Sequence, residues 1–320
     1  MGRLLVVGLP GPTLSSEDAA HLRAIRAGGF IPFERNYVSP GQFRALLVQI
    51  RETLDRDVLV MVDHEGGRVV RLTNGVTRFA DPLTVGRTQP PQEVERQGAV
   101  EARELKGLGI HVNLAPCVDV LVEGADPVIG TRSYGSDPLR VAAMGAARIR
   151  GLQEGGVAAC AKHFPGLGAV PKDPHTHLPT VGLGAEAMRR VHLAPFSEAI
   201  QAGVAMIMSS HVCYPNFERA SAEPATFSPW LIRDLLRGEL GFQGVVVSDD
   251  LEMGALRQLC PVGEAAVRAV EAGHDALLVC SDPAAQRQVF EALCVACQTG
   301  RLSTAALEQS AGRLHRQFPL

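Results

Sequence analysis

The sequence GVVVSDD, residues 244–250, is a short apolar run that ends in two consecutive aspartates. A continuous apolar run of this length is typical of a strand that is buried on both faces of a parallel sheet. If the alternation of side chains continues to the strand end, Asp249 points into the centre of the fold and Asp250 points elsewhere. Carboxylates at the end of a buried strand are unfavourable unless they are paired, so this strand end is a candidate functional site.

Seven further runs of this kind follow one another along the chain at a steady spacing. They occupy residues 3–9, 29–33, 57–63, 110–116, 158–164, 205–211 and 276–282. Stretches with helical periodicity lie between most of the runs, and several of them begin with Ser, Asp or Pro and end with Gly, as helix caps prefer. Examples are residues 41–54, 92–109, 138–156 and 228–241.

This alternation of eight strands with helices predicts an α/β fold, a (β/α)8 barrel of the TIM type. A doubly wound open sheet is the alternative. The sequence contains no internal repeat, low-complexity tract or linker, so we expect residues 1–320 to form a single barrel domain. The last helix, expected near residues 303–317, would cover the barrel.

The composition is that of an ordinary soluble globular protein, with 46% hydrophobic and 20% charged residues and a formal net charge of −3. This charge excludes a bulk field that would attract nucleic acid or anionic lipid. No segment approaches the ~18 apolar residues of a membrane span, and the apolar run near the N-terminus is too short for a signal peptide. The seven cysteines are scattered, which is typical of reduced thiols in a cytosol. We expect a cytoplasmic monomer without a nucleic-acid or membrane partner.

Polar side chains follow several of the predicted strands directly. In a (β/α)8 barrel the functional groups lie where strands end and the following loops begin, so these side chains should meet at one end of the barrel. Alternatively, individual members only cap helices or form hydrogen bonds across the barrel rim. The groups lie at residues 63–65, 113–119, 162–163, 209–211 and 248–250.

The loop KHFPGLGAVPKDPHTHLP, residues 162–179, is too rich in proline and glycine to form a helix. Asp173 and His175 are two residues apart in this loop. A carboxylate at that spacing can orient an imidazole and raise its basicity, and the imidazole can then exchange a proton near neutral pH. His177 is the alternative partner for the carboxylate.

The sequence DHEGGRVVRL, residues 63–72, places two glycines and two arginines after a predicted strand. The glycines permit a positive φ or a close approach of the backbone to a ligand. Asp63, Arg68 and Arg71 could then bind hydroxyl groups, a carboxylate or an amide, and Arg132 follows in a second loop. A glycine turn with ion pairs at the rim is the alternative.

The same residues could serve two other chemistries, metal binding and Schiff-base formation. The spacing of the histidines fits neither an HExxH motif nor a cysteine–histidine zinc site, and the CxxC of Cys294 and Cys297 has no second pair, so neither a metal nor a cofactor is predicted. Lys162 at a strand end could form a Schiff base, which leaves an aldolase-like lyase open. The histidines whose spacing was compared with these metal-binding motifs are His163, His175, His177 and His211.

Six segments of the chain resemble, in order, the motifs of the family 3 glycoside hydrolases. The resemblance is strongest to the single-domain bacterial β-N-acetylglucosaminidases that recycle cell-wall fragments. It covers about residues 27–257. The segments are AGGFIPFERNY, VDHEGGRVVRL, APCVDV, PVIGTRSYGSDP, AKHFPGLGAVPKDPH and LGFQGVVVSDDLEMGAL.

The resemblance implies a retaining hydrolase of terminal β-linked N-acetylglucosamine. Asp249 would be the nucleophile that forms a covalent glycosyl–enzyme, and His175, paired with Asp173, would be the acid/base in place of a second carboxylate. The substrate-binding residues implied by the resemblance are Asp63, Arg71, Arg132, Lys162 and His163.

The chain departs from the family pattern at three positions. Leu167 replaces a loop histidine, Pro174 replaces the serine between the members of the dyad, and His64 replaces a glutamine. None of these positions is the nucleophile or a dyad member, but Leu167 and Pro174 affect how the loop closes. Leu167 leaves a catalytically weak sugar-binding protein as one alternative function. A phosphorylase is another, because a neutral histidine would repel a phosphate dianion less than a carboxylate base would.

Overall fold

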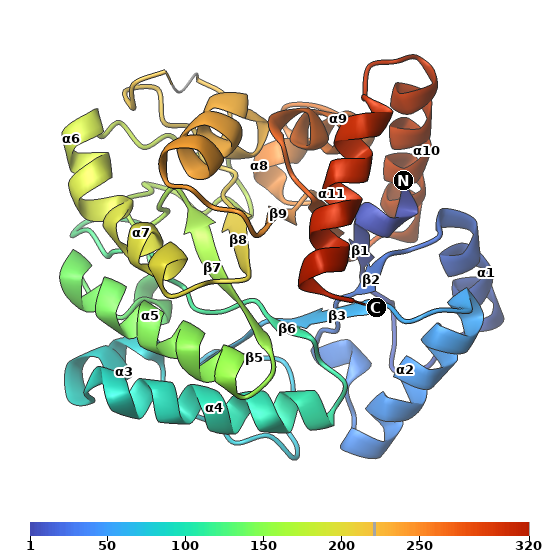
Figure 1. Cartoon of the computed structure of the whole chain (residues 1–320), viewed down its shortest axis with the longest axis horizontal. Helices are drawn as coiled ribbons and strands as arrows, with labels where there is room; N and C mark the ends of the chain where they lie inside the picture. The colour runs from blue at the N-terminus through green and yellow to red at the C-terminus, as the bar shows by residue number, and fades with distance from the viewer. Residues whose placement is uncertain (220–221, 320) are drawn as a thin grey trace.

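A computed structural model describes residues 1–219 and 222–319 of the chain. Eight parallel strands close into a barrel in the order β1-β10-β9-β8-β7-β6-β3-β2, and helices surround it (Figure 1). This closed sheet confirms the predicted (β/α)8 barrel and excludes the doubly wound open sheet. The barrel strands are β1 (Leu5–Val7), β2 (Gly29–Phe30), β3 (Leu59–Val62), β6 (Val112–Asn113), β7 (Ala158–Phe164), β8 (Met206–Ser209), β9 (Val245–Asp250) and β10 (Ala276–Val279).

Each predicted run contains one barrel strand, but most strands are shorter than predicted. The run at 110–116, for example, contributes only β6 to the sheet. Strands of a barrel are tilted and staggered, so the ends of an apolar run extend beyond the neighbouring strand and pass into rim loops. The sequence pattern shows where a strand is buried, but it does not show where its partner ends.

A short antiparallel hairpin, β4 (His64–Gly66) with β5 (Val69–Val70), was not predicted from the sequence. Gly66, which ends β4, and Gly67, which begins the turn, have φ angles of 101° and 54°. A Cβ atom on Gly67 would lie 2.4 Å from the Cβ atom of Asp81. The two glycines are therefore required both by the backbone conformation and by the close packing of the turn.

The helices begin where the sequence supplies capping groups. Ser39 accepts a hydrogen bond from the backbone N–H of Gln42, and Asp137 accepts one from Leu139, each just before a proline in the first turn. The predicted helix at 228–241 is present as a helix with π-type hydrogen bonding, Trp230–Glu239. The other helices are α1 (Ser16–Ile25), α2 (Pro40–Leu54), α3 (Pro82–Thr88), α4 (Pro91–Gly107), α5 (Pro138–Glu154), α6 (Ala185–Ala187), α7 (Ala194–Gln201), α8 (Gly254–Arg257), α9 (Val262–Ala272), α10 (Pro283–Gln298) and α11 (Thr304–Gln317).

The core has two parts, and strand alternation decides which part each side chain joins. In β9, Val245 and Val247 belong to the cluster inside the barrel, whereas Val246 packs in the cluster between the barrel and the helices. Asp249 continues the inward-facing series of Val245 and Val247. Cys160 belongs to the inner cluster in the same way, so Lys162, two residues later, also faces the barrel interior.

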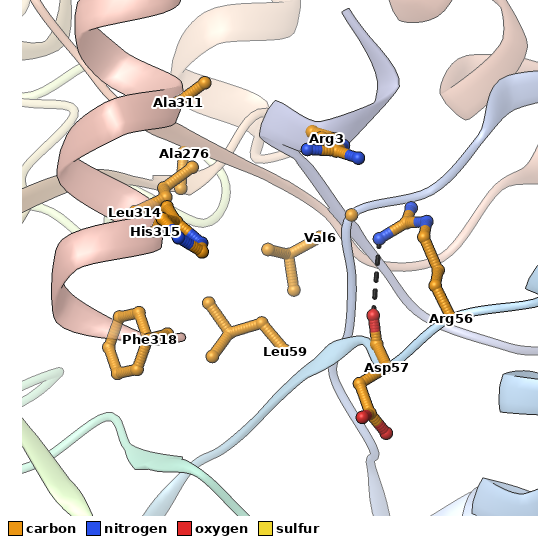
Figure 2. Close-up of a pocket in the computed structure, with 11 residues that line it drawn as sticks. Arg3, Val6, Arg56, Asp57, Leu59, Ala276, Ala311, Leu314, His315 and Phe318 are labelled. Atoms are coloured by element: carbon orange, nitrogen blue, oxygen red, sulfur yellow. Dashed lines mark hydrogen bonds between the residues drawn. The ribbon is translucent and has the colours of Figure 1, made fainter. Parts of the chain in front are cut away.

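The N-terminal end of the barrel lies under α11, which carries Leu314 toward the strands. A cavity of about 140 Å³ remains there, lined by Val6, Leu59 and Leu314 and bordered by Arg3 and Arg56 (Figure 2). The guanidinium of Arg56 donates to the backbone carbonyls at the C-terminal end of α1. Among the described residues, no helix combines the length and the apolar character needed to span a membrane.

Candidate active site

A cavity of about 510 Å³ opens at the C-terminal end of the barrel. Ligand sites in this fold are expected there, and the volume lies in the range of small-molecule sites. All eight residues selected from the sequence line this one cavity: Asp63, Arg71, Arg132, Lys162, His163, Asp173, His175 and Asp249. Glu65, Arg68, Asp250 and Cys280 line it as well; Glu65 belongs to the strand-end group 63–65 but was given no role from the sequence, and Cys280 was not singled out.

Lys162 lies at the centre of a buried ionic network. Its Nζ atom is 2.7 Å from Oδ1 of Asp63 and 2.6 Å from Oε1 of Glu65. Burial would lower the pKa of Lys162, but the two carboxylates outweigh burial and raise it above its usual value. Lys162 therefore remains a protonated ammonium group that donates hydrogen bonds. A Schiff-base lysine requires the neutral amine, so this environment opposes the lyase alternative.

Glu65 joins Lys162 to Arg132. Its two carboxylate oxygens accept hydrogen bonds of 2.8 Å from Nε and Nη2 of Arg132. Burial alone would raise the pKa of Glu65, but Arg132 and Lys162 outweigh it and hold the pKa well below its usual value. Glu65 thus keeps both cations in place at the cavity wall. Its position two residues after Asp63 was the available signal in the sequence.

His163 is oriented by the carboxylate of Asp119, which belongs to the strand-end group 113–119 but was given no role from the sequence. Nδ1 of His163 lies 2.7 Å from Oδ2 of Asp119, whose Oδ1 accepts a hydrogen bond of 2.6 Å from the backbone of Leu167. Burial raises the pKa of Asp119, but these partners outweigh it and the pKa is lowered. A carboxylate can only accept, so Nδ1 carries the proton and Nε2 faces Arg132 at 3.3 Å.

One group of side chains has the donor atoms and spacing for a metal ion. Sγ of Cys117, a carboxylate oxygen of Asp119 and a ring nitrogen of His163 lie within 4.8 Å of one another. In the structure the thiol and the imidazole both use Oδ2 of Asp119, at 3.2 Å and 2.7 Å. Burial raises the pKa of the Cys117 thiol well above its usual value, which disfavours the thiolate that a metal ion would need.

Asp173 and His175 form a close pair in the loop after β7. Nδ1 of His175 lies 2.6 Å from Oδ1 of Asp173, and the backbone N–H of His175 donates to the same oxygen at 2.8 Å. The side chains are 59% and 38% exposed, so the imidazole lies at the cavity mouth. His177 interacts through Nδ1 with the hydroxyl of Thr176 instead, and the carboxylate of Asp173 pairs with His175.

The loop that carries this pair is attached to the start of α8. The backbone N–H of Gly254 donates to the carbonyl of His175 at 2.9 Å, and Ala255 donates to Pro174 at 3.1 Å. A Cβ atom on residue 254 would lie 2.6 Å from the carbonyl oxygen of His175. Glycine at this position therefore allows the loop backbone to approach α8.

Asp249 ends the inward-facing series of β9. Its Oδ1 accepts a hydrogen bond of 2.8 Å from the backbone N–H of Asp250. Burial raises the pKa of Asp249, but His163, His211 and this hydrogen bond outweigh it, so the pKa lies below its usual value. The carboxylate is therefore ionised at neutral pH. The carboxylate of Asp250 is held separately, by the backbone N–H groups of Glu252 and Cys280.

Arg71 lies at the outer edge of the cavity. Its guanidinium is 3.4 Å from a carboxylate oxygen of Glu34 and 5.6 Å from the ring centroid of Phe33. Arg68, on the same hairpin, donates to the carbonyl of Val128 at 2.5 Å. The hairpin is thus fixed to the loop that carries Arg132. Phe33 also lines the cavity, and the sequence did not predict this.

Comparisons with known proteins show the family to which the chain belongs. The model of the glycosyl hydrolase family 3 N-terminal domain matches residues 1–317. A beta-hexosaminidase of Methylococcus capsulatus is 38% identical over 288 residues, which are 89% of this chain and 85% of that protein.

Solved structures of the same kind superpose closely on this chain. A family 3 β-N-acetylglucosaminidase from Paenibacillus sp. superposes with a TM-score of 0.95 at 40% identity over 99% of this chain, which spans only 61% of that protein. NagZ from Neisseria gonorrhoeae, solved with N-trifluoroacetyl-D-glucosamine, superposes with a TM-score of 0.85 at 31% identity, over 98% of this chain and 89% of NagZ. The chain therefore belongs to glycosyl hydrolase family 3 and is a glycoside hydrolase.

Proposed function

We propose that this protein is an exo-acting, retaining β-N-acetylglucosaminidase that releases terminal β-linked N-acetylglucosamine. The observation that carries the proposal is the pairing of two groups around one cavity. An ionised carboxylate, Asp249, lies at its inner end, and a carboxylate-bound imidazole, His175, lies at its mouth. The relatives named β-hexosaminidase and β-N-acetylglucosaminidase support the choice of sugar.

In the first step, Asp249 attacks the anomeric carbon from the face opposite the leaving group. The glycosidic bond breaks as a bond to the carboxylate oxygen forms, and His175 gives its proton to the departing oxygen. In the second step, His175 removes a proton from water, which attacks the anomeric carbon and displaces Asp249. Two inversions give overall retention, and the imidazole and the carboxylate return to their starting states.

Asp173 would hold the Nδ1–H group of His175, so that Nε2 carries the proton given in the first step and has a lone pair for the proton taken from water in the second. Asp63 and Lys162, joined at 2.7 Å, would bind the sugar hydroxyl groups, with Arg132 and His163 beside them. Arg71, at the mouth of the cavity, would complete the sugar pocket. These are the roles that we assign to the substrate-binding residues.

We further propose that peptidoglycan fragments are the natural substrate and that the protein acts as a cytoplasmic monomer. All seven cysteines are free in the structure, and four of them are buried, which supports a reducing compartment. The exposed dyad at the cavity mouth leaves room for a large group on the leaving side of the scissile bond.

The test compares the turnover of an aryl β-N-acetylglucosaminide with that of the matching aryl β-glucoside, each with and without phosphate. We expect faster turnover of the acetamido substrate, release of the free sugar and no dependence on phosphate. Formation of a sugar 1-phosphate would establish the phosphorylase alternative instead. Failure to turn over either glycoside, with normal sugar binding, would establish the sugar-binding alternative.

A further inference from the structure

His211 follows β8 and is fully buried, beside the end of β9, the strand that carries Asp249. Its Nε2 atom lies 3.0 Å from the backbone carbonyl oxygen of Asp250, and its Nδ1 atom lies 2.6 Å from the hydroxyl of Thr226. A carbonyl oxygen can only accept, so Nε2 carries a proton. Burial lowers the pKa of His211. In the neutral ring Nδ1 then has a lone pair, which faces the Thr226 hydroxyl. The single proton of this hydroxyl has two acceptors within reach, Nδ1 of His211 at 2.6 Å and the backbone carbonyl oxygen of Ser210 at 3.0 Å.

The residue that His211 holds is also the residue that holds the nucleophile. The carbonyl of Asp250 accepts from His211, while its backbone N–H donates to Oδ1 of Asp249 at 2.8 Å. A shift of this carbonyl would rotate residue 250 and change the direction of its N–H group. His211 therefore acts on the carboxylate of Asp249 through one intervening residue.

Thr226 is itself fixed by a buried polar chain. Its hydroxyl lies 3.3 Å from the hydroxyl of Ser209, which is 2.7 Å from Nε2 of His274. Nδ1 of His274 donates to the carbonyl of Ala269 in α9 at 2.9 Å. All these polar side chains are completely buried. This series of polar side chains thus runs from α9 to the end of β9. Strand β9 lies next to β8 and pairs with it in register (Figure 1).

We propose that His211, held between the Thr226 hydroxyl and the Asp250 carbonyl, is a positioning residue that fixes the carboxylate of Asp249 through the backbone of Asp250. This inference rests on the proposed function, because it assumes that Asp249 is the nucleophile. A positioning group that is already in place lowers the barrier of the attacking step without strengthening the binding of the free sugar. Loss of the group should therefore reduce kcat and leave sugar binding unchanged.

The primary test is the matched pair Thr226→Val and Thr226→Ser. Valine has nearly the same shape as threonine but lacks the hydroxyl that contacts Nδ1 of His211 and the carbonyl of Ser210, whereas serine keeps that hydroxyl. We expect Thr226→Val to slow glycosylation by about tenfold or more, since one buried hydrogen bond carries that much. Thr226→Ser should remain within about threefold of the wild type, because it preserves that bond. The readouts are kcat for an aryl β-N-acetylglucosaminide, the inactivation rate by a 2-fluoro glycosyl reagent, and the dissociation constant of free N-acetylglucosamine.

A second pair tests the imidazole directly. His211→Gln keeps an N–H group at about the reach of Nε2, and His211→Phe removes it. We expect Gln to recover most of the rate that Phe loses. A merely structural role would lower the unfolding midpoint but leave the rate of the folded enzyme unchanged, so the rates are compared at a temperature where every variant is folded.

The outcomes separate this inference from the proposed function. If the reagent labels a residue other than Asp249 in the wild-type protein, the proposed function is wrong. If Asp249 is labelled, but Thr226→Val reacts as fast as Thr226→Ser, the positioning role of His211 is wrong. A parallel loss of sugar binding and rate in Thr226→Val would also overturn it. Should His211→Phe fail to fold, the threonine pair still decides the question.

Discussion

The Nζ atom of Lys162 and the Oε1 atom of Glu65 lie 2.6 Å apart, and their side chains are only 2% and 1% exposed. Arg132 binds the same carboxylate with two nitrogens, and Asp63 binds the other side of Lys162. Two cations and two carboxylates thus neutralise one another at the wall of the candidate active-site cavity. The arrangement places fixed hydrogen-bond donors at this wall, where the proposed function puts a sugar, and each of these buried charges is paired.

The first prediction concerns Glu65→Gln. Removing this carboxylate leaves the buried cations Lys162 and Arg132 with only one carboxylate to balance their charge. This should lower the free energy of unfolding by roughly 3 kcal/mol and raise KM. Urea unfolding and steady-state kinetics measure the two effects. Glu95→Gln, which disrupts the exposed pair with Arg150, is the control and should change neither quantity. Equal behaviour of the two variants would mean that the buried network does not hold the site.

The second prediction concerns the nucleophile. Asp249→Asn should lower the turnover rate by several powers of ten and leave the fold intact, because it removes a group that acts in the transition state. A 2-fluoro glycosyl inactivator should attach to the peptide that contains Asp249, as mass spectrometry would show. Attachment to Asp250 or Glu252 would refute this assignment. Glu252 already accepts hydrogen bonds from the backbone of Ser281 and Asp282, which makes it a poor nucleophile.

The third prediction separates the two duties of His175. A substrate with a poor leaving group, such as a sugar alcohol, needs the proton and should lose heavily in His175→Ala. A substrate with an activated phenolate leaving group should lose much less, and deglycosylation should become rate-limiting. Azide should then restore the rate, because it attacks the glycosyl–enzyme without base assistance.

Two neighbouring changes complete this test. Asp173→Asn should act in the same direction as His175→Ala but more mildly, because it misorients the imidazole without removing it. His177→Ala is the matched control and should be near neutral, since that ring interacts with Thr176. If His177→Ala were the damaging change, or if His175→Ala slowed both kinds of substrate equally, the dyad would be wrongly assigned.

The fourth prediction concerns stability at acid pH. Burial, with Arg148 and Arg78 nearby, lowers the pKa of His64 to about 4 from its model-peptide value of 6.5. Below pH 6.5 the unfolded chain binds a proton at this site that the folded protein does not bind. The folded protein therefore loses stability as the pH falls from 6.5 toward 4. This single group accounts for a loss of about 2 kcal/mol at pH 5.

His64→Gln should remove that contribution. The free energy of unfolding, measured in urea between pH 7.5 and pH 5, should fall less steeply in the variant than in the wild type. His274, whose pKa burial lowers to about 3, is present in both proteins and cancels in the comparison. Identical slopes would show that His64 titrates normally.

The fifth prediction concerns metals and thiols. Activity should survive incubation with EDTA and with a reductant, since the proposed steps need only Asp249 and His175. A loss of activity that zinc reverses would contradict this prediction. Cys117→Ser and a metal analysis would then show whether Cys117, Asp119 and His163 form the site, because their donor atoms lie within 4.8 Å.

The sequence by itself determined the barrel and the end of the barrel that carries the chemistry. Buried strands in a parallel sheet need continuous apolar runs, and this local requirement is visible in GVVVSDD and its seven counterparts. Alternation along β9 also predicts that Asp249 faces inward with Val245 and Val247. The polar residues directly after the apolar runs are visible in the same way, and their concentration at the strand ends indicates a site there.

Only the tertiary structure decided which of these polar groups meet. Asp63 and Lys162 are 99 residues apart, Glu65 and Arg132 are 67 apart, and Asp119 and His163 are 44 apart. Such pairs depend on the stagger of the closed barrel and on the paths of its loops, and neither leaves a local periodic signal. For the same reason the pattern placed Glu65 and Asp119 among the polar groups at the strand ends, but it did not show which side chains they bind. The free energy that keeps these two carboxylates buried comes from partners that the fold brings to them from distant parts of the chain.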